Sequence, residues 1–123
     1  MKLQPDRFDF AAVTGYDTDW VAVLGEKITA SFVICSDGQR FDWPCQRFED
    51  LQAQHFEQLA QLPIEVVIFG SGQKLRFASP ALMQSLMQKR MGLETMDTQA
   101  ACRTYNILAG EGRKVALAVL IET

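Results

Sequence analysis

The chain has 123 residues, of which 48% are apolar and 22% are charged. These values are ordinary for one globular domain, which we place over residues 1–123, and they argue against disorder. The formal net charge is −3, and an acidic chain is a poor nucleic-acid partner, because binding a phosphate backbone requires a dense positive field.

The N-terminal third predicts a β-layer. Residues 1–18 are mostly polar and predict an irregular arm. Apolar residues alternate over 20–24 and again over 28–34, which predicts two strands joined by a tight turn. Asp37-Gly38 predicts a second hairpin turn, of type I′. We therefore expect an antiparallel β-layer in this third of the chain.

Helical and strand patterns alternate in the rest of the chain. From Phe48 the apolar spacing is helical until Pro63. A β-branched run over 64–69 predicts a strand that is buried on both faces. Ser79-Pro80 predicts the start of the next helix, and Gly92 predicts its left-handed C-cap.

The last elements complete a β-α-β-α-β order. Residues 93–96 predict a short strand, Asp97 predicts the N-cap of the last helix, and 114–121 predict the final strand. Right-handed crossovers place helices on both faces of such a sheet. The predicted fold is α/β and three-layered, with a parallel or mixed sheet flanked by helices and an added N-terminal antiparallel β-layer.

Gly70-Ser71-Gly72 follows the buried strand, where phosphate-binding loops often lie. The run lacks the third glycine of a dinucleotide loop and the Gly-Lys-Ser/Thr of a Walker loop, so a tight turn is the simpler interpretation. Ser71 is not in a Gly-x-Ser-x-Gly elbow, and the lone His55 falls among core-facing helix positions. Serine hydrolysis is therefore not favoured.

The three cysteines, Cys35, Cys45 and Cys102, are far apart and form no C-x-x-C. Structural zinc sites take their ligands in closely spaced pairs, so we predict buried free thiols and no metal. Reduced thiols, the absence of a secretory leader and the absence of an apolar run of about 20 residues predict a cytoplasmic protein without membrane insertion.

The glycine run and the start of the last helix both follow parallel strands, so they meet at the sheet edge where ligands of open α/β sheets bind. A polar face with i, i+4, i+7 spacing continues along that helix and consists of Gln99, Arg103 and Asn106. The simpler interpretation of this face is a solvated surface, and the simpler interpretation of Asp97 is a helix cap. The alternative is that these residues form a ligand site. The candidate pocket that we predict here consists of Gly70, Ser71, Gly72, Asp97, Thr98, Arg103 and Asn106.

Of these residues, Arg103 is the strongest candidate for a functional role, because a guanidinium binds a carboxylate or phosphate with two parallel hydrogen bonds. The predicted occupant of the pocket is accordingly a small anionic ligand. No complete catalytic or cofactor-binding constellation is present in the sequence, so we expect no cofactor.

A connected pattern in the second half resembles a known family. It comprises residues 67–72, Arg76-Phe77 with Ser79-Pro80, residues 94–106 and residues 110–113. The pattern is similar to that of a small domain family of unknown function that includes stand-alone bacterial and archaeal proteins and the mitochondrial complex I assembly factor 3. The resemblance implies a three-layer fold of helices on a mixed or parallel sheet.

The resemblance and the incomplete catalytic motifs together predict a non-catalytic interaction or assembly protein with a protein partner. A respiratory or membrane-associated complex is the expected target. The alternative, from another functional class, is a small-molecule binding protein or enzyme that uses the pocket at the carboxyl edge of the sheet.

Overall fold

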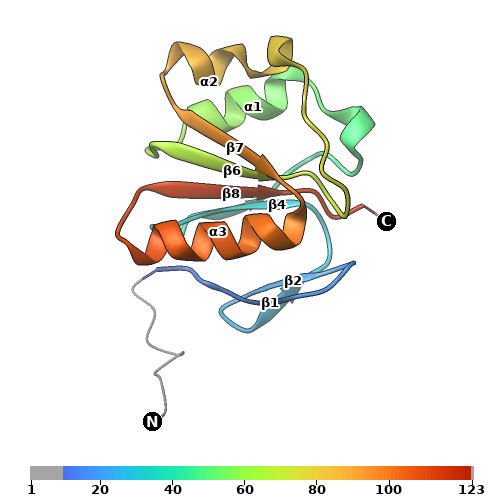
Figure 1. Cartoon of the computed structure of the whole chain (residues 1–123), viewed down its shortest axis with the longest axis vertical. Helices are drawn as coiled ribbons and strands as arrows, with labels where there is room; N and C mark the ends of the chain where they lie inside the picture. Colours follow the sequence, from blue (N-terminus) through green and yellow to red (C-terminus); the bar gives the residue numbers. More distant parts are fainter. Residues whose placement is uncertain (1–9, 123) are drawn as a thin grey trace.

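The computed structural model describes residues 10–122, which form two sheets and the helices around them (Figure 1). The small antiparallel sheet has the order β1 (Val13–Tyr16), β2 (Val21–Val23) and β3 (Glu26–Ile28). The large sheet has the order β5 (Arg40–Asp42), β4 (Phe32–Cys35), β8 (Val115–Val119), β6 (Val66–Gly70) and β7 (Gly92–Met96). The helices are η1 (Phe48–Asp50), α1 (Ala53–Ala60), η2 (Pro80–Met83), α2 (Gln84–Gln88) and α3 (Thr98–Gly110).

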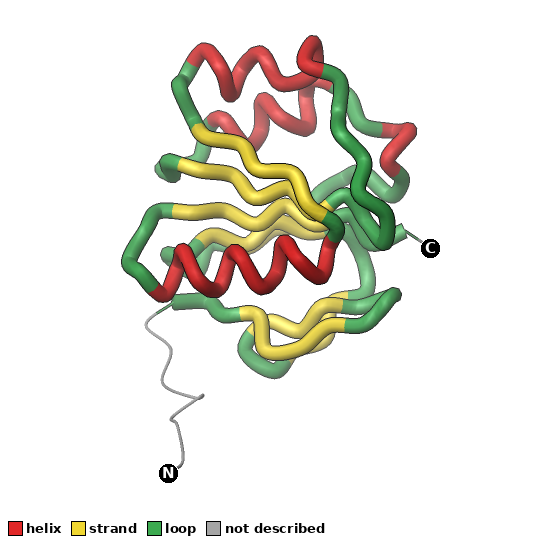
Figure 2. The backbone as a smooth tube through the Cα atoms, viewed as in Figure 1, coloured by secondary structure: helices red, strands yellow, loops and turns green. Residues whose placement is uncertain are grey.

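The large sheet is mixed. Strand β6 is parallel to β7 and to β8, whereas β4 is antiparallel to β8 and to β5. Helices α1 and α2 cover one face, and α3 covers the other face together with the small sheet (Figures 1 and 2). The predicted α/β fold, with its helix-flanked mixed sheet and antiparallel layer, is confirmed.

The apolar run of β8 is buried on both faces. Val115, Leu117 and Val119 pack in the cluster that contains α3, and Ala116 and Ala118 pack in the cluster that contains α1. All five side chains are completely buried. A strand sandwiched between two helical layers has no solvent-facing side, so its sequence is continuously apolar instead of alternating.

The N-terminal third departs from the prediction because it is shared between the two sheets. The expected arm over 1–18 contains β1, and its first nine residues lie outside the described part. The expected strand over 28–34 is two strands, β3 and β4, in different sheets. The chain crosses between them at Ser31, whose buried hydroxyl accepts a hydrogen bond from the N–H of Ile121 at 2.9 Å.

Two predicted left-handed positions are also corrected. In the β4–β5 turn Gly38 has a φ of 99° but Asp37 has no positive φ, so the turn is not type I′, which requires both. At the end of α2 the left-handed residue is Arg90, with a φ of 56°, instead of Gly92. Arg90 reverses the chain so that the N–H of Met91 donates to the carbonyl of Leu86, a helix-terminating bond.

The two helices predicted between strands are each divided into a 3-10 turn and an α-helix, namely η1 with α1 and η2 with α2. The predicted start of the second one is confirmed: the Ser79 side chain accepts from the N–H of Ala81, and Pro80 is the first helical residue. Over residues 10–122, none of these helices combines the length and apolarity needed to cross a membrane.

Candidate functional site

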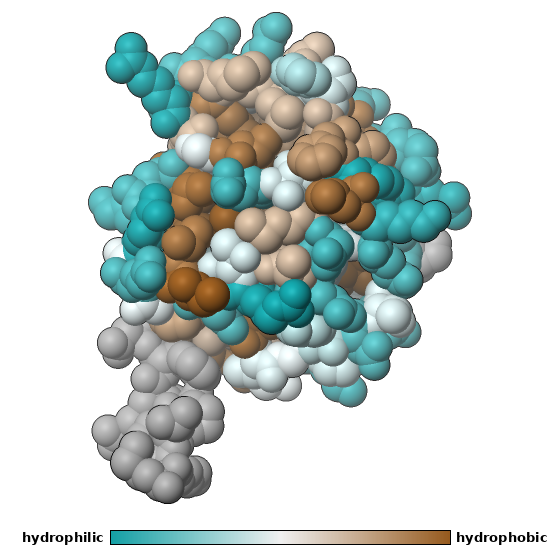
Figure 3. Space-filling model, viewed as in Figure 1, coloured by the Kyte–Doolittle hydropathy of each residue, from teal (hydrophilic) through white to brown (hydrophobic). Residues whose placement is uncertain are grey.

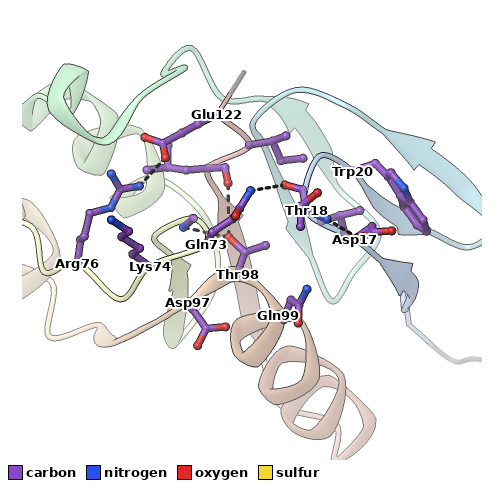
Figure 4. A pocket seen from close by; sticks show the side chains of 14 residues that line it. Asp17, Thr18, Trp20, Gln73, Lys74, Arg76, Asp97, Thr98, Gln99 and Glu122 are labelled. Carbon is purple, nitrogen blue, oxygen red and sulfur yellow. Dashed lines mark hydrogen bonds and ion pairs between the residues drawn. The ribbon is translucent and has the colours of Figure 1, made fainter.

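A cavity of about 630 Å³ opens at the carboxyl end of β6 (Figure 4). Its walls come from the turn before β2, the loop after β6, the start of α3 and the residues after β8. The lining residues are Asp17, Thr18, Trp20, Val21, Gly72, Gln73, Lys74, Arg76, Asp97, Thr98, Gln99, Leu120, Ile121 and Glu122.

Ser71 holds the loop after β6 together through hydrogen bonds of its side chain. Its side chain is completely buried, and its hydroxyl donates to the carbonyl of Lys74 at 2.6 Å and accepts from the N–H of Arg76 at 2.9 Å. A hydroxyl that is held by two backbone groups is a structural clamp. This geometry agrees with the tight-turn interpretation of the glycine run.

Arg76 lies in the cavity wall and takes part in an extended cluster of contacts. One guanidinium nitrogen donates to the carbonyl of Ser71 at 2.6 Å and to Oε1 of Glu122 at 2.7 Å. The guanidinium also lies over the Phe48 ring, 4.7 Å from its centroid. We call Ser71, Arg76, Glu122 and Phe48 the Arg76 cluster.

Glu122 is held by this cluster as a carboxylate. Burial alone would raise its pKa, but hydrogen bonds from Arg76 and from the N–H of Phe48 outweigh burial and lower the pKa below its ordinary value. Arg76 and Glu122 therefore form a charged pair that ties the loop after β6 to the end of the chain.

The N-terminus of α3 is joined to the glycine run. Asp97 is its N-cap, as predicted, and accepts from the N–H of Ala100 at 3.0 Å. The N–H of Thr98 donates to the carbonyl of Gly72 at 2.8 Å, and the N–H of Gly72 donates to Oγ1 of Thr98 at 3.0 Å. The N–H groups of Thr98 and Ala100 belong to the first turn of α3, where such groups attract anions at other helix starts, and both are bonded within the protein.

Both glycines of the run allow close contacts. A Cβ on Gly70 would lie 3.2 Å from Cα of Thr98. Gly72 has a φ of +104°, and a Cβ there would lie 2.7 Å from a guanidinium nitrogen of Arg76. The missing side chains thus let the loop approach α3 and leave room for Arg76.

The seven predicted pocket residues occupy different places. Gly72, Asp97 and Thr98 line the cavity, and Gly70 and Ser71 lie behind its wall. Arg103 and Asn106 are not among the lining residues.

The polar face of α3 instead holds β1. The Asn106 amide accepts from the N–H of Val13 at 2.9 Å and donates to the carbonyl of the same residue at 2.7 Å. Arg103 donates to the hydroxyl of Tyr16 at 2.9 Å, and this hydrogen bond raises the pKa of Arg103. The i, i+4, i+7 spacing on α3 is therefore explained in part by contacts with β1, which lies 87 to 93 residues earlier in the chain.

Sequence reasoning missed Lys74, Arg76, Glu122 and Trp20 in the cavity wall. Arg76 stands between Leu75 and Phe77 in the sequence. A cation between two apolar residues in a loop was a signal that could have identified it as a site residue. Glu122 follows directly on the buried apolar run over residues 115–121. Lys74 takes part in no ion pair within residues 10–122.

His55 is fully engaged in the N-cap region of α1. Its Nδ1 accepts from the N–H of Gln52 at 2.9 Å, and its Nε2 donates to the carbonyl of Pro44 at 2.7 Å. The side chain is buried, as the core-facing position predicted. Both ring nitrogens are thus used by the backbone.

The cysteines are free and buried, as predicted. Burial is the main reason that the pKa is raised to about 12 for Cys35, about 11 for Cys45 and about 12 for Cys102. All three are protonated thiols at neutral pH, which makes them poor nucleophiles.

Residues 13–120 match the model of a family described as protein of unknown function (DUF498/DUF598). This chain belongs to that family. A solved structure from Bordetella parapertussis is 34% identical, with a TM-score of 0.86 over 92% of this chain and 97% of that one. A Bordetella pertussis structure described as a Mth938-like domain is 30% identical, with a TM-score of 0.84 over 99% and 93%. The resemblance seen in the sequence is confirmed.

The chain is also similar to NADH dehydrogenase (ubiquinone) 1 alpha subcomplex assembly factor 3. The mouse protein is 31% identical over 110 residues, which are 88% of this chain and 59% of that protein. The Xenopus tropicalis protein is 23% identical over 121 residues, 97% of this chain and 66% of that protein. This chain therefore spans less than two-thirds of the length of these relatives.

Proposed function

We propose that this protein is a non-catalytic interaction module that helps a membrane-associated respiratory complex to assemble. The likeness to assembly factor 3 supports this role. The buried free thiols support a reducing compartment such as the cytoplasm as its place of action. Within residues 10–122, the Ser71 hydroxyl and the His55 imidazole are bonded to backbone groups, which supports a role without catalysis.

The observation that carries the proposal is the shape of the loop over residues 71–79, which we call the docking loop. Leu75 and Phe77 are 54% and 70% exposed. Between them Arg76 points inward and holds the loop through Ser71 and Glu122. Large apolar side chains on a loop that is already ordered lose little conformational entropy on binding, which is the usual property of an interface anchor.

Phe77→Ser tests the docking loop, with Ile107→Ser as a matched control. Ile107 is 61% exposed and lies on α3, away from the loop in the sequence. Each tagged protein would be expressed in the native host, cross-linked and purified, and its partners quantified by mass spectrometry.

We expect wild type and Ile107→Ser to recover subunits of a membrane-bound respiratory complex, and Phe77→Ser to recover at least fivefold less. Recovery of no such subunit by wild type, or equal recovery by all three proteins, would contradict the proposed function. Thermal unfolding of each variant would establish that the fold is intact.

A second candidate function is the binding of a small anionic ligand in the cavity. The observation that favours it is Lys74, the lining cation that forms no ion pair among the described residues. Asp17, Asp97 and Glu122 also line the cavity, so we expect a ligand that carries a positive group beside its carboxylate or phosphate.

Thermal shift measurements with amino acids and phosphorylated metabolites test this candidate, because a ligand that binds the native state raises the melting temperature. Lys74→Met should abolish the shift. An absence of any shift at millimolar concentration, or an equal shift in Lys74→Met, would count against the cavity as an anion site.

A further inference from the structure

We propose that β7 is the contact edge of a symmetric dimer, in which two copies of this chain pair antiparallel through β7 and join their large sheets. The inference is independent of the proposed assembly role, because it concerns the sheet edge and not the docking loop.

The backbone of β7 has one bonded side and one open side. The N–H of Gly92 donates to the carbonyl of Glu65 at 3.0 Å, and the carbonyl of Met96 accepts from the N–H of Ser71 at 2.8 Å. Even-numbered residues of β7 therefore bond toward β6, and the N–H and C=O groups of Leu93 and Thr95 point outward. Strand β7 is last in the order of the large sheet, so no described strand pairs with these groups.

The opposite edge of the same sheet is protected. Strand β5 has only three residues, and its Arg40 forms an ion pair with Glu26 of β3 at 3.0 Å. Short strands and charged side chains are the usual means of blocking edge-to-edge pairing. Strand β7 has five residues, and Glu94 is its only charged one. Of the two edges, β7 is the one built to accept a further strand.

Apolar side chains flank the open edge. Met87 on α2 is 56% exposed, and Met83 and Met91 lie four residues to either side of it and are partly buried. Figure 3 shows brown and beige atoms spread over the part of this face where Figure 1 draws β7 and α2. Flexible methionine side chains pack well against an identical surface related by a twofold axis.

Among registers centred on one of the three middle residues of β7, the sequence favours one. In an antiparallel pair with a twofold axis, one residue lies opposite its own copy. An axis at Glu94 would place two carboxylates opposite each other, which is destabilising. An axis at Thr95 would place Met91 opposite Gln99, which is already in α3.

An axis at Leu93 avoids both problems. It pairs Leu93 with its copy and Met91 with Thr95, and it places Glu94 opposite Gly92, which has no side chain. Because the N–H and C=O of Leu93 point outward, this central pair exchanges two hydrogen bonds.

The charges that flank β7 are complementary in this arrangement. Lys89 and Arg90 precede the strand, Asp97 follows it, and antiparallel pairing brings the basic end of one copy to the acidic end of the other. Neither Lys89 nor Arg90 forms an ion pair within the part of the chain that the structure describes. A lipid surface would leave the outward backbone groups of β7 without partners, whereas a second copy satisfies them.

Thr95→Pro tests the pairing, because proline removes the outward N–H of residue 95 and leaves the hydrogen bonds to β6 intact. Thr95→Val is the matched control, since it keeps the N–H. Sedimentation equilibrium from 1 µM to 500 µM would measure the mass, and circular dichroism would confirm the fold. We expect wild type and Thr95→Val to reach twice the 13.8 kDa chain mass, with the dimer dissociation constant raised at least tenfold in Thr95→Pro.

Oxidative cross-linking tests the register. With Leu93 on the axis, the two Cα atoms of residue 93 lie about 5.5 Å apart, within disulfide range, whereas those of residue 94 lie roughly 8 Å apart, beyond it. Leu93→Cys should form a covalent dimer and Glu94→Cys should not. The native thiols are buried and give little background.

Three results would overturn the proposal. They are a monomeric wild type at every concentration, a dimer that Thr95→Pro leaves unchanged, and covalent dimers of Glu94→Cys without those of Leu93→Cys. A wild type that binds only an unrelated chain at β7 would give the first of these results.

Discussion

The docking loop has two sides with opposite character. Inward, Ser71 and Arg76 use their polar atoms in hydrogen bonds to the backbone and to Glu122. Outward, Leu75 and Phe77 are more than half exposed. Ser71, whose hydroxyl first suggested a site, thus maintains the structure together with Arg76. The two exposed apolar residues, which precede and follow Arg76, form the surface that we propose for a partner. Reactive residue types indicate function only when their hydrogen-bonding groups are available.

Gly72→Ala should have the largest effect on the inward side. Alanine at this position would have to adopt a φ of +104°, and its Cβ would lie 2.7 Å from a guanidinium nitrogen of Arg76. We therefore expect the free energy of unfolding to fall by about 2–4 kcal/mol. Gly38→Ala is the control, because its φ is +99° with nothing within 4 Å. Its loss should be about 1–2 kcal/mol in urea denaturation. Equal losses in both variants would mean that Arg76 does not need the space.

Asn106→Ala should have the next largest effect. It removes both hydrogen bonds to Val13 and should cost about 1–3 kcal/mol. Hydrogen exchange should show that the N–H of Val13 loses its protection. Gln99→Ala, an exposed position on the same helix, should change stability by less than about 0.5 kcal/mol. A similar small change in Asn106→Ala would point to a role for Asn106 other than holding β1.

Glu122→Gln should show how much the charged pair of Arg76 and Glu122 contributes to the free energy of unfolding. Because the folded-state pKa of Glu122 lies below its ordinary value of 4.5, the carboxylate stabilises the fold above pH 4.5. This stabilisation is lost as the pH falls through the lower, folded-state pKa. We expect the variant to be less stable by about 1 kcal/mol at pH 7, with the difference disappearing in acid. A difference that does not depend on pH would exclude the charge as its cause.

Phe77→Ser should have the smallest effect on stability. At 70% exposure its ring contributes little to the core, so the free energy of unfolding should change by less than about 0.5 kcal/mol. The buried Phe56→Ala should lose about 3–5 kcal/mol in the same assay. A large loss in Phe77→Ser would mean that the docking loop needs the ring for its own conformation.

Local patterns predicted the parts of the fold that depend on neighbouring residues. The β-branched run before Gly70 predicted β6, and Asp97 predicted the start of α3, because burial on two faces and capping are both visible within a few residues. Arg90 shows the limit of such reasoning. Its left-handed φ follows from the turn that connects α2 to β7, whereas glycine is the residue that favours this conformation.

The α/β class, the order of the second-half elements and a pocket at the carboxyl edge of the sheet were all predicted from the sequence pattern. These follow from apolar periodicity, which is set by the spacing of side chains along one element. Three features became visible only in the folded molecule: Asn106 holds β1, Arg76 pairs with Glu122, and β7 is an outer strand of the large sheet. Each of these depends on which distant segments come together, and the packing of the whole chain settles that choice.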